Sequence, residues 1–199
     1  YLLGPIETEQ NRQDANRTWK KTVLDLISWD VDPDPERDST FFKAWLRAQY
    51  ADSIRERKAG ALDKDWELIG TTFHRWVRDN ESRIGTGKAD RNLTLMTEDF
   101  PFFARAYQLI LTASRSYTKG LEPLFFNANN DFTWQSTVLL APLCTDDDDD
   151  TVRRKMAVVA NYIDIWLMRR VTNYTRVSYA SSSYTMYLLC REIRGRSLH

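Results

Sequence analysis

Apolar side chains recur at intervals of three and four residues along most of this chain, and this spacing constrains the fold more than any other feature. Over residues 7–29 the apolar and small side chains fall on one face of a helix, and the same period returns in later segments. Seven glycines and six prolines in 199 residues are too few for the frequent turns of an all-β protein. The sequence therefore predicts an all-α fold.

Helix breakers and capping residues divide the chain into about six to seven helices. Pro33 and Pro35 end the first helix, because a residue that precedes proline is driven out of the helical conformation. The cations at 55–58, followed by Gly60, are typical of the last turn and the C-cap of the second helix. Polar or irregular stretches at 85–92 and 120–132 are expected to be loops. The helices are expected at 7–29, 38–59, 65–83, 97–117, 133–143, 151–171 and 181–194.

The helix expected over 151–171 is predicted to be the central helix of this multi-helix bundle. It carries Ile163 and Trp166 on one side and Ile165 and Met168 on another, so it is apolar on nearly every side. Ile163 and Trp166 are therefore expected in the central core. Residues 1–199 are treated as a single helical region with a candidate sub-boundary near residues 85–95.

The composition, the start of the sequence and the spacing of its cysteines indicate which class of protein this is. Apolar residues make up 42% of the chain, which is enough for a core and inconsistent with a disordered chain. The start at Tyr1 lacks an initiator methionine and a signal-peptide pattern, so we expect a fragment of a longer protein that stays in the cytoplasm. The longest apolar stretch, 156–168, is shorter than the ~20 residues that span a bilayer, and no membrane partner is expected. Cys144 and Cys190 have no CxxC spacing and are expected to be buried thiols.

No pattern of residues predicts catalysis or metal binding. The Gly-Thr-Gly-Lys run at 85–88 lacks the glycine and the hydroxyl residue that a phosphate-binding loop requires on either side. The aspartates at 146–150 lack the glycine and the closing glutamate of a calcium loop, and are interpreted as acids at a helix N-terminus. His74 and His199 have no residues around them that mark a catalytic base. We expect no catalytic residue, no metal ligand and no cofactor in this chain.

The strongest functional signal is a basic C-terminal quarter. From position 151 onward, nine arginines and lysines stand against two acids, although the whole chain is neutral. Guanidinium groups pair with phosphates and tyrosines stack on bases, so this composition suits a nucleic-acid surface. In the alternative interpretation these cations bind helix carbonyls and acids of the N-terminal half. The candidate nucleic-acid-binding residues are Arg169, Arg170, Asn173, Arg176, Arg191 and Arg194.

Four stretches of the sequence resemble one family over nearly the whole length of the chain. They are Tyr1-Leu2-Leu3, Asn16-Arg17-Thr18-Trp19-Lys20, Phe41-Phe42-Lys43-Ala44-Trp45-Leu46-Arg47-Ala48 and, above all, Tyr162-Ile163-Asp164-Ile165-Trp166-Leu167-Met168-Arg169-Arg170. These stretches resemble the GmrSD-type proteins, bacterial modification-dependent DNA restriction enzymes that depend on nucleoside triphosphates and defend against phage.

The resemblance implies that this chain is the helical region that follows a ParB-like and sulfiredoxin-like N-terminal domain. In that family the N-terminal domain carries an Asp-Gly-Gln-Gln-Arg motif, and many members end in an HNH nuclease domain; neither motif occurs here. The parent protein would use GTP or ATP with a divalent metal, outside this chain. The partners implied are DNA and other domains of the same chain. The alternative from another functional class is a structural or protein-interaction helical module that does not bind nucleic acid.

Overall fold

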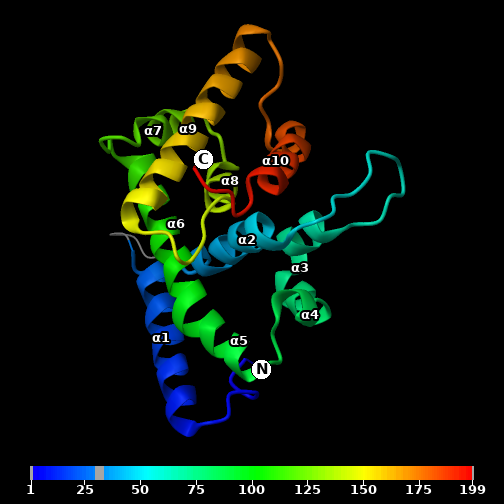
Figure 1. Cartoon of the computed structure of the whole chain (residues 1–199). Coiled ribbons are helices and arrows are strands. Elements are labelled where there is room, and N and C mark those ends of the chain that lie inside the picture. Colours follow the sequence, from blue (N-terminus) through cyan, green and yellow to red (C-terminus); the bar gives the residue numbers. More distant parts are fainter. Residues whose placement is uncertain (1, 30–33, 199) are drawn as a thin grey trace.

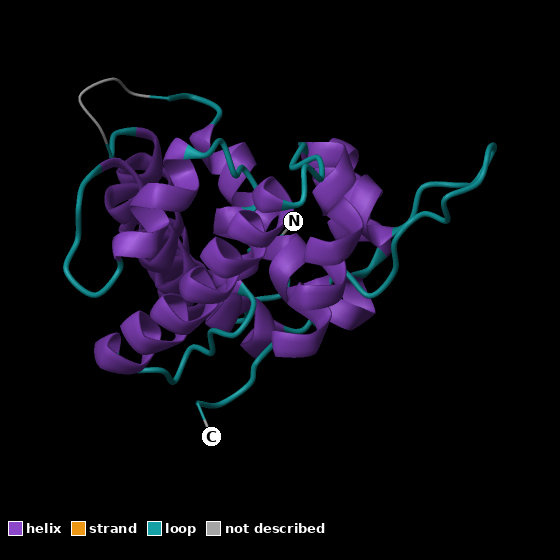
Figure 2. Cartoon of the chain, turned by 90° about the horizontal axis from the view of Figure 1, so that it is seen from above, coloured by secondary structure: helices purple, strands orange, loops and turns teal. Residues whose placement is uncertain are grey.

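The computed structural model describes residues 2–29 and 34–198, and every regular element in those ranges is a helix. The all-α, multi-helix fold predicted from the apolar spacing is confirmed (Figures 1 and 2). The turn predicted at Pro33 lies outside the described residues. The elements are α1 (Glu9–Ile27), α2 (Arg37–Tyr50), α3 (Asp65–Asp79), α4 (Glu81–Ile84), α5 (Ala89–Thr94), the π-helical η1 (Leu95–Asp99), α6 (Phe100–Arg115), α7 (Glu122–Asn129), α8 (Gln135–Leu140), α9 (Asp149–Thr172) and α10 (Tyr179–Ile193).

Helix α2 occupies the middle of the bundle. It packs against α1, α3, α6, α8 and α10, and it crosses the centre of Figure 1. Phe41 and Ala48 of α2 are completely buried, as are Leu139 and Leu140 of the short helix α8. These side chains belong to one continuous core that also takes in α6, α9 and α10. The core includes residues on both sides of the candidate sub-boundary at 85–95.

The prediction that the 151–171 helix is central is wrong. Helix α9 packs on α7 and α8 through one face, on which Ile163 is fully buried. Its opposite face is open, with Val158 exposed to 61% and Ile165 to 57%. Trp166 is half-buried and packs at the edge of the core, 5.9 Å from the ring of Phe132. A helix that is apolar all round is usually enclosed, but here the bundle covers one side of it only.

Three segments differ from the expected assignments. Helix α2 ends at Tyr50, and residues 51–64 leave the body of the molecule as a long excursion that returns to α3 (Figures 1 and 2). Residues 122–129, expected to be irregular, form α7, with a proline in the first turn where its missing N–H has no cost. Helices α5, η1 and α6 follow one another without a break, so the expected 85–92 loop ends at Lys88.

None of the helices in the described ranges combines the length and the apolar character that crossing a lipid bilayer requires.

Candidate nucleic-acid interface

The six predicted nucleic-acid-binding residues fall into two groups at opposite ends of α10. Arg169, Arg170, Asn173 and Arg176 lie at the end of α9 and in the connection that leads to α10, at the top of Figure 1. Arg191 and Arg194 lie at the far end of α10. A helix of 15 residues is about 22 Å long, so the six side chains do not form one compact surface.

In the first group, two of the four side chains hold the local fold. Arg170 donates through Nε to the Arg176 carbonyl at 3.0 Å, and its guanidinium lies 4.8 Å from the centre of the Trp166 ring. The Asn173 side chain donates to the Arg169 carbonyl at 2.7 Å, as the Asn173 backbone amide does at 3.2 Å, and both bonds cap the end of α9. The guanidinium groups of Arg169 and Arg176 are exposed and pair with no carboxylate among the described residues.

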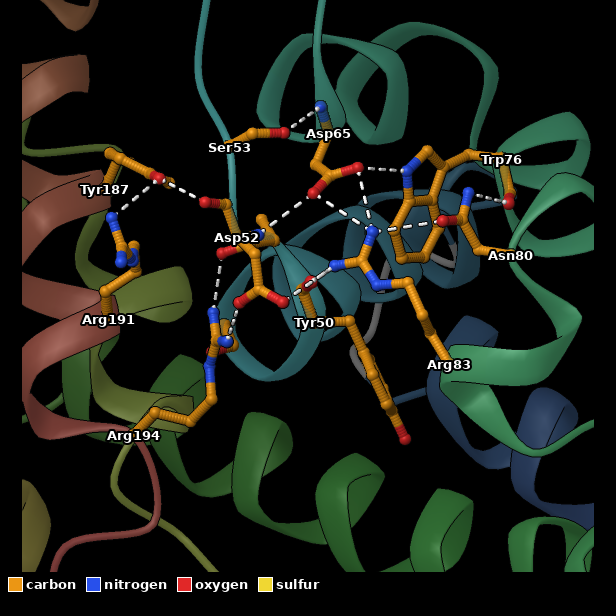
Figure 3. Close-up of polar contacts among 12 residues, drawn as sticks. Tyr50, Asp52, Ser53, Asp65, Trp76, Asn80, Arg83, Tyr187, Arg191 and Arg194 are labelled. Carbon is orange, nitrogen blue, oxygen red and sulfur yellow. Dashed lines mark hydrogen bonds and ion pairs between the residues drawn. The ribbon is translucent and has the colours of Figure 1, made fainter.

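The second group is split in the same way (Figure 3). Arg194 is half-buried and donates to the carbonyls of Ala48 and Ala51, both at 2.8 Å, and to the Asp52 carboxylate at 2.7 Å. Its charge is thus neutralised inside the protein, as the alternative interpretation expected. Arg191 is exposed, donates to the Tyr187 hydroxyl at 3.2 Å, and lies 5.6 Å from the centre of the Tyr187 ring. Of this group, Arg191 alone presents its charge to solvent.

A polar network closes the base of the 51–64 segment and joins it to α10 (Figure 3). The Asp52 amide donates to the Asp65 carboxylate at 3.0 Å, and Arg83 binds both carboxylates, at 3.0 Å from Asp52 and 3.1 Å from Asp65. From α10, the Tyr187 hydroxyl donates to the Asp52 carbonyl at 2.6 Å. Together with the ion pair from Arg194, these bonds fix the distance between the segment and α10.

The carboxylate of Asp65 is the most strongly bonded acid of this network. Burial by itself raises its pKa, but hydrogen bonds from Arg83, the Trp76 indole and the Asp52 amide outweigh burial and hold the pKa below its ordinary value. The Trp76 Nε1 to Asp65 distance is 2.9 Å. Asp65 is therefore ionised in the folded protein and serves as an anchor for the segment rather than as a proton donor or acceptor.

Between the 51–64 segment and α10 runs a groove, which we call the arginine–aromatic groove. It consists of two adjoining hollows of about 300 and 640 Å³ that share residues 54–57 and Tyr184. The α10 wall presents residues at intervals of three and four, which places them on one face of the helix. The groove is defined here by its unpaired cations and its rings: Arg47, Arg57, Arg191, Trp66, Trp134, Tyr179, Tyr184 and Tyr187.

All carboxylates that line the groove are engaged by other groups. Asp52 pairs with Arg83 and Arg194, Glu56 pairs with Lys58 and Lys64, and Glu67 accepts the backbone amides of Arg55 and Lys64. Arg55 pairs with Asp63 at 3.0 Å. Within the described ranges this leaves the three groove arginines, at 47, 57 and 191, without a carboxylate partner. The groove is consequently positive although the whole chain is neutral.

The arginines of the groove are held against aromatic rings. The Arg47 guanidinium lies 5.2 Å from the Trp66 ring and 5.1 Å from the Trp134 ring. Arg57 lies 4.7 Å from the ring of Tyr184, which is 40% exposed. Cation–π contacts orient a guanidinium without neutralising its charge, so these groups remain available to phosphates.

Gly70 makes the position of Arg47 possible. A Cβ added at Gly70 would lie 1.9 Å from Nη2 of Arg47, so any larger residue at position 70 has to displace the guanidinium. Arg47 also donates to the Trp66 carbonyl at 2.8 Å and to the Tyr179 hydroxyl at 3.1 Å. Three separate contacts therefore fix this one charge at the bottom of the groove.

Sequence reasoning found Arg191 but missed the other two arginines of the groove. Arg57 belongs to the 55–58 run that was interpreted as the last turn of a helix, and the structure shows this interpretation to be wrong. If the second helix had been predicted to end at Tyr50, residues 55–58 would have been predicted as a basic loop. A basic loop is the sequence signal that could have identified Arg57 as a binding residue. Arg47 carries no such signal, because Trp66 and Trp134 reach it from distant parts of the chain.

The described residues contain no cluster of three or more histidines, cysteines or acids that could hold a metal ion. Both cysteines are free thiols; burial raises the pKa of Cys190 to about 12 and also raises that of the half-buried Cys144. Comparison of the chain with family models, with curated proteins and with solved structures gave no match.

Proposed function

We propose that this chain is a DNA-contacting helical region of a modification-dependent restriction protein, and that it contacts DNA through the arginine–aromatic groove. The observation that carries the DNA-binding part is the set of three groove arginines, each positioned on aromatic rings and without a carboxylate partner in the described ranges. Guanidinium groups pair bidentately with phosphates, and exposed tyrosine rings stack on unpaired bases. The restriction-protein part is supported by the sequence resemblance.

The proposed role is binding and positioning rather than catalysis. In the family that the chain resembles, nucleotide hydrolysis is linked to the Asp-Gly-Gln-Gln-Arg motif, which does not occur in this sequence. A chain of this kind would hold DNA near catalytic domains and connect them. GTP or ATP and its divalent metal would bind to those domains.

A second candidate function, protein interaction without DNA, is favoured by the open face of α9. This face presents apolar side chains at intervals of three and four residues, which is the pattern of a face that packs on another protein surface. Their exposures are 61% for Val158, 50% for Tyr162, 57% for Ile165, 41% for Met168 and 55% for Val171. Another domain of the same chain is the partner expected for it.

The proposal is tested by DNA titration of matched charge variants, with fluorescence anisotropy of labelled 20-nucleotide single strands and duplexes as the readout. We expect non-specific binding with a dissociation constant of about 10⁻⁶ to 10⁻⁴ M, tighter for the single strand because stacking needs unpaired bases. The double substitution Arg57→Gln and Arg191→Gln is expected to weaken binding about tenfold or more.

Two further double variants remove the same charge from other surfaces. The pair Arg169→Gln and Arg176→Gln tests the tip of α9, and the pair Arg105→Gln and Arg153→Gln removes two exposed arginines of α6 and α9 that do not line the groove. Binding that falls equally in all three pairs would show that DNA is attracted to any exposed arginine and not to the groove in particular. Binding that is unchanged in the groove pair would exclude the groove as the DNA site, whereas a parent chain that does not bind DNA at all would favour protein interaction.

A further inference from the structure

A second binding site is suggested by an apolar cavity of about 570 Å³ between α1, α2, α3 and the N-terminal segment. Small-molecule sites in proteins have volumes of about 300 to 1,000 Å³, and mostly apolar walls with a few polar groups. Helix α2 lines this cavity with Phe42, Trp45, Leu46 and Tyr50, whereas it lines the groove with Arg47. The cavity and the groove are therefore separate sites.

The walls of the cavity are aromatic. The rings of Trp19 and Phe42 are stacked with 5.7 Å between their centres, and Phe42 stacks on Phe73 at 5.8 Å. Trp19 and Phe42 are only partly buried, so part of each ring is accessible from the cavity. Aromatic rings attract a further planar ring in offset-stacked or edge-to-face geometry.

The mouth of the cavity is positive. His74 and Arg78 are exposed, line the cavity and stand four residues apart on α3, on the same helix face. The backbone of Thr72, with φ −138° and ψ 46°, interrupts α3 just before this pair. Within the described ranges Arg78 has no ion pair, and no carboxylate lines the cavity. The mouth is thus suited to an anion.

We propose that this cavity binds a small aromatic molecule that carries an anionic group. The aromatic part of the ligand packs against the accessible parts of Trp19, Phe42 and Phe73, and the anionic group pairs with Arg78 at the mouth. The aromatic walls and the charge at the mouth are independent observations, and one ligand of this class satisfies both.

The test uses two fluorescent probes that differ mainly by one charge. 1-Anilinonaphthalene-8-sulfonate is aromatic and anionic, and N-phenyl-1-naphthylamine is its neutral counterpart. We expect both to bind the folded chain saturably at one site, the anionic probe more tightly. Arg78→Gln is expected to lower the affinity for the anionic probe about fivefold to tenfold and to leave the affinity for the neutral probe unchanged.

The matched control is Arg75→Gln, which removes an exposed arginine of the same helix that pairs with Asp79 and does not line the cavity. Val77→Trp, which fills the cavity from its α3 wall, is expected to abolish binding of both probes while the cooperative thermal transition is retained. The proposal is overturned if Arg75→Gln and Arg78→Gln affect the anionic probe equally, or if a folded Val77→Trp variant binds as before. The arginine pair decides the question even if Val77→Trp does not fold.

Discussion

Asp52 is the residue through which three parts of the chain are joined. Its carboxylate pairs with Arg83 of α4 and with Arg194 after α10, while its amide and carbonyl bond to Asp65 and Tyr187. The side chain of Asp52 is 62% exposed, so each of its ion pairs contributes little by itself. The role of Asp52 is to position these elements, because bonds to this one residue hold the two walls of the groove at a fixed distance.

Asp65 allows this network to be tested by pH. Because the pKa of Asp65 is lowered in the folded state, its contribution to stability is present above its ordinary pKa near 3.8 and is lost as the pH falls through the lower folded value. Asp65→Asn is expected to reduce the free energy of unfolding by about 1.5 to 3 kcal/mol at neutral pH. The difference from the parent chain should shrink below about pH 4, as measured by urea denaturation.

Asp63→Asn is the control, since Asp63 is 42% exposed and, among the described residues, forms a surface ion pair with Arg55 alone. Loss of the Asp63–Arg55 ion pair is expected to reduce the free energy of unfolding by about 1 kcal/mol or less. Equal losses in the two variants, or a difference that does not depend on pH, would show that Asp65 does not anchor the segment as an ionised group.

Among the elements, α9 shows how far an apolar pattern can mislead. Periodicity identified its existence and its length closely, since the expected 151–171 became Asp149–Thr172. The same pattern could not tell which of its faces the bundle covers, because apolar residues occur on all of them. Only the packing of α7 and α8, which contact one side of α9, decides this.

Truncations along α9 test this correction. Ile163→Ala is expected to reduce the free energy of unfolding by about 2 to 5 kcal/mol, because Ile163 is fully buried and a cavity would remain. Ile165→Ala, at a 57% exposed position, is expected to change it by about 0.5 kcal/mol or less. Trp166→Ala should cost less than the ~3 to 5 kcal/mol of a fully enclosed tryptophan. All three are measured by urea denaturation. Equal losses of unfolding free energy at positions 163 and 165 would show that both faces of α9 are buried and that α9 is the central helix after all.

The 51–64 segment is the element on which the proposed function depends most. Replacing residues 55–63 with a glycine–serine linker of the same length keeps the network at its base and removes Arg57 and one wall of the groove. We expect a small change in melting temperature, because Arg55–Gly60, Leu62 and Asp63 are exposed. DNA affinity, measured by anisotropy, is expected to fall as far as in the double arginine variant. Affinity that is retained would place DNA elsewhere on the protein.

At the scale of the whole molecule, the fold class could be predicted from the sequence. Of the three groove arginines, only Arg191 was among the predicted nucleic-acid-binding residues, and the groove itself was not predicted. The helical period and the low glycine and proline content are local properties, and they led correctly to an all-α bundle. The groove depends on contacts between residues far apart in sequence, such as Arg47 with Trp134 and Asp52 with Arg194. Local charge counting placed the basic surface at the C-terminal end, whereas folding adds arginines from α2 and the 51–64 segment to it.

Salt dependence of single-stranded DNA binding tests the central claim most directly. Each phosphate that an arginine neutralises releases condensed counterions, which contributes about 0.7 to the slope of log affinity against log salt for a single strand and about 0.9 for a duplex. Two lost contacts in the Arg57→Gln and Arg191→Gln variant are therefore expected to flatten the slope by about 1.4 units on the single strand and about 1.8 on the duplex. An unchanged slope in that variant, with the parent's thermal stability, would contradict the claim that the groove arginines bind the DNA backbone.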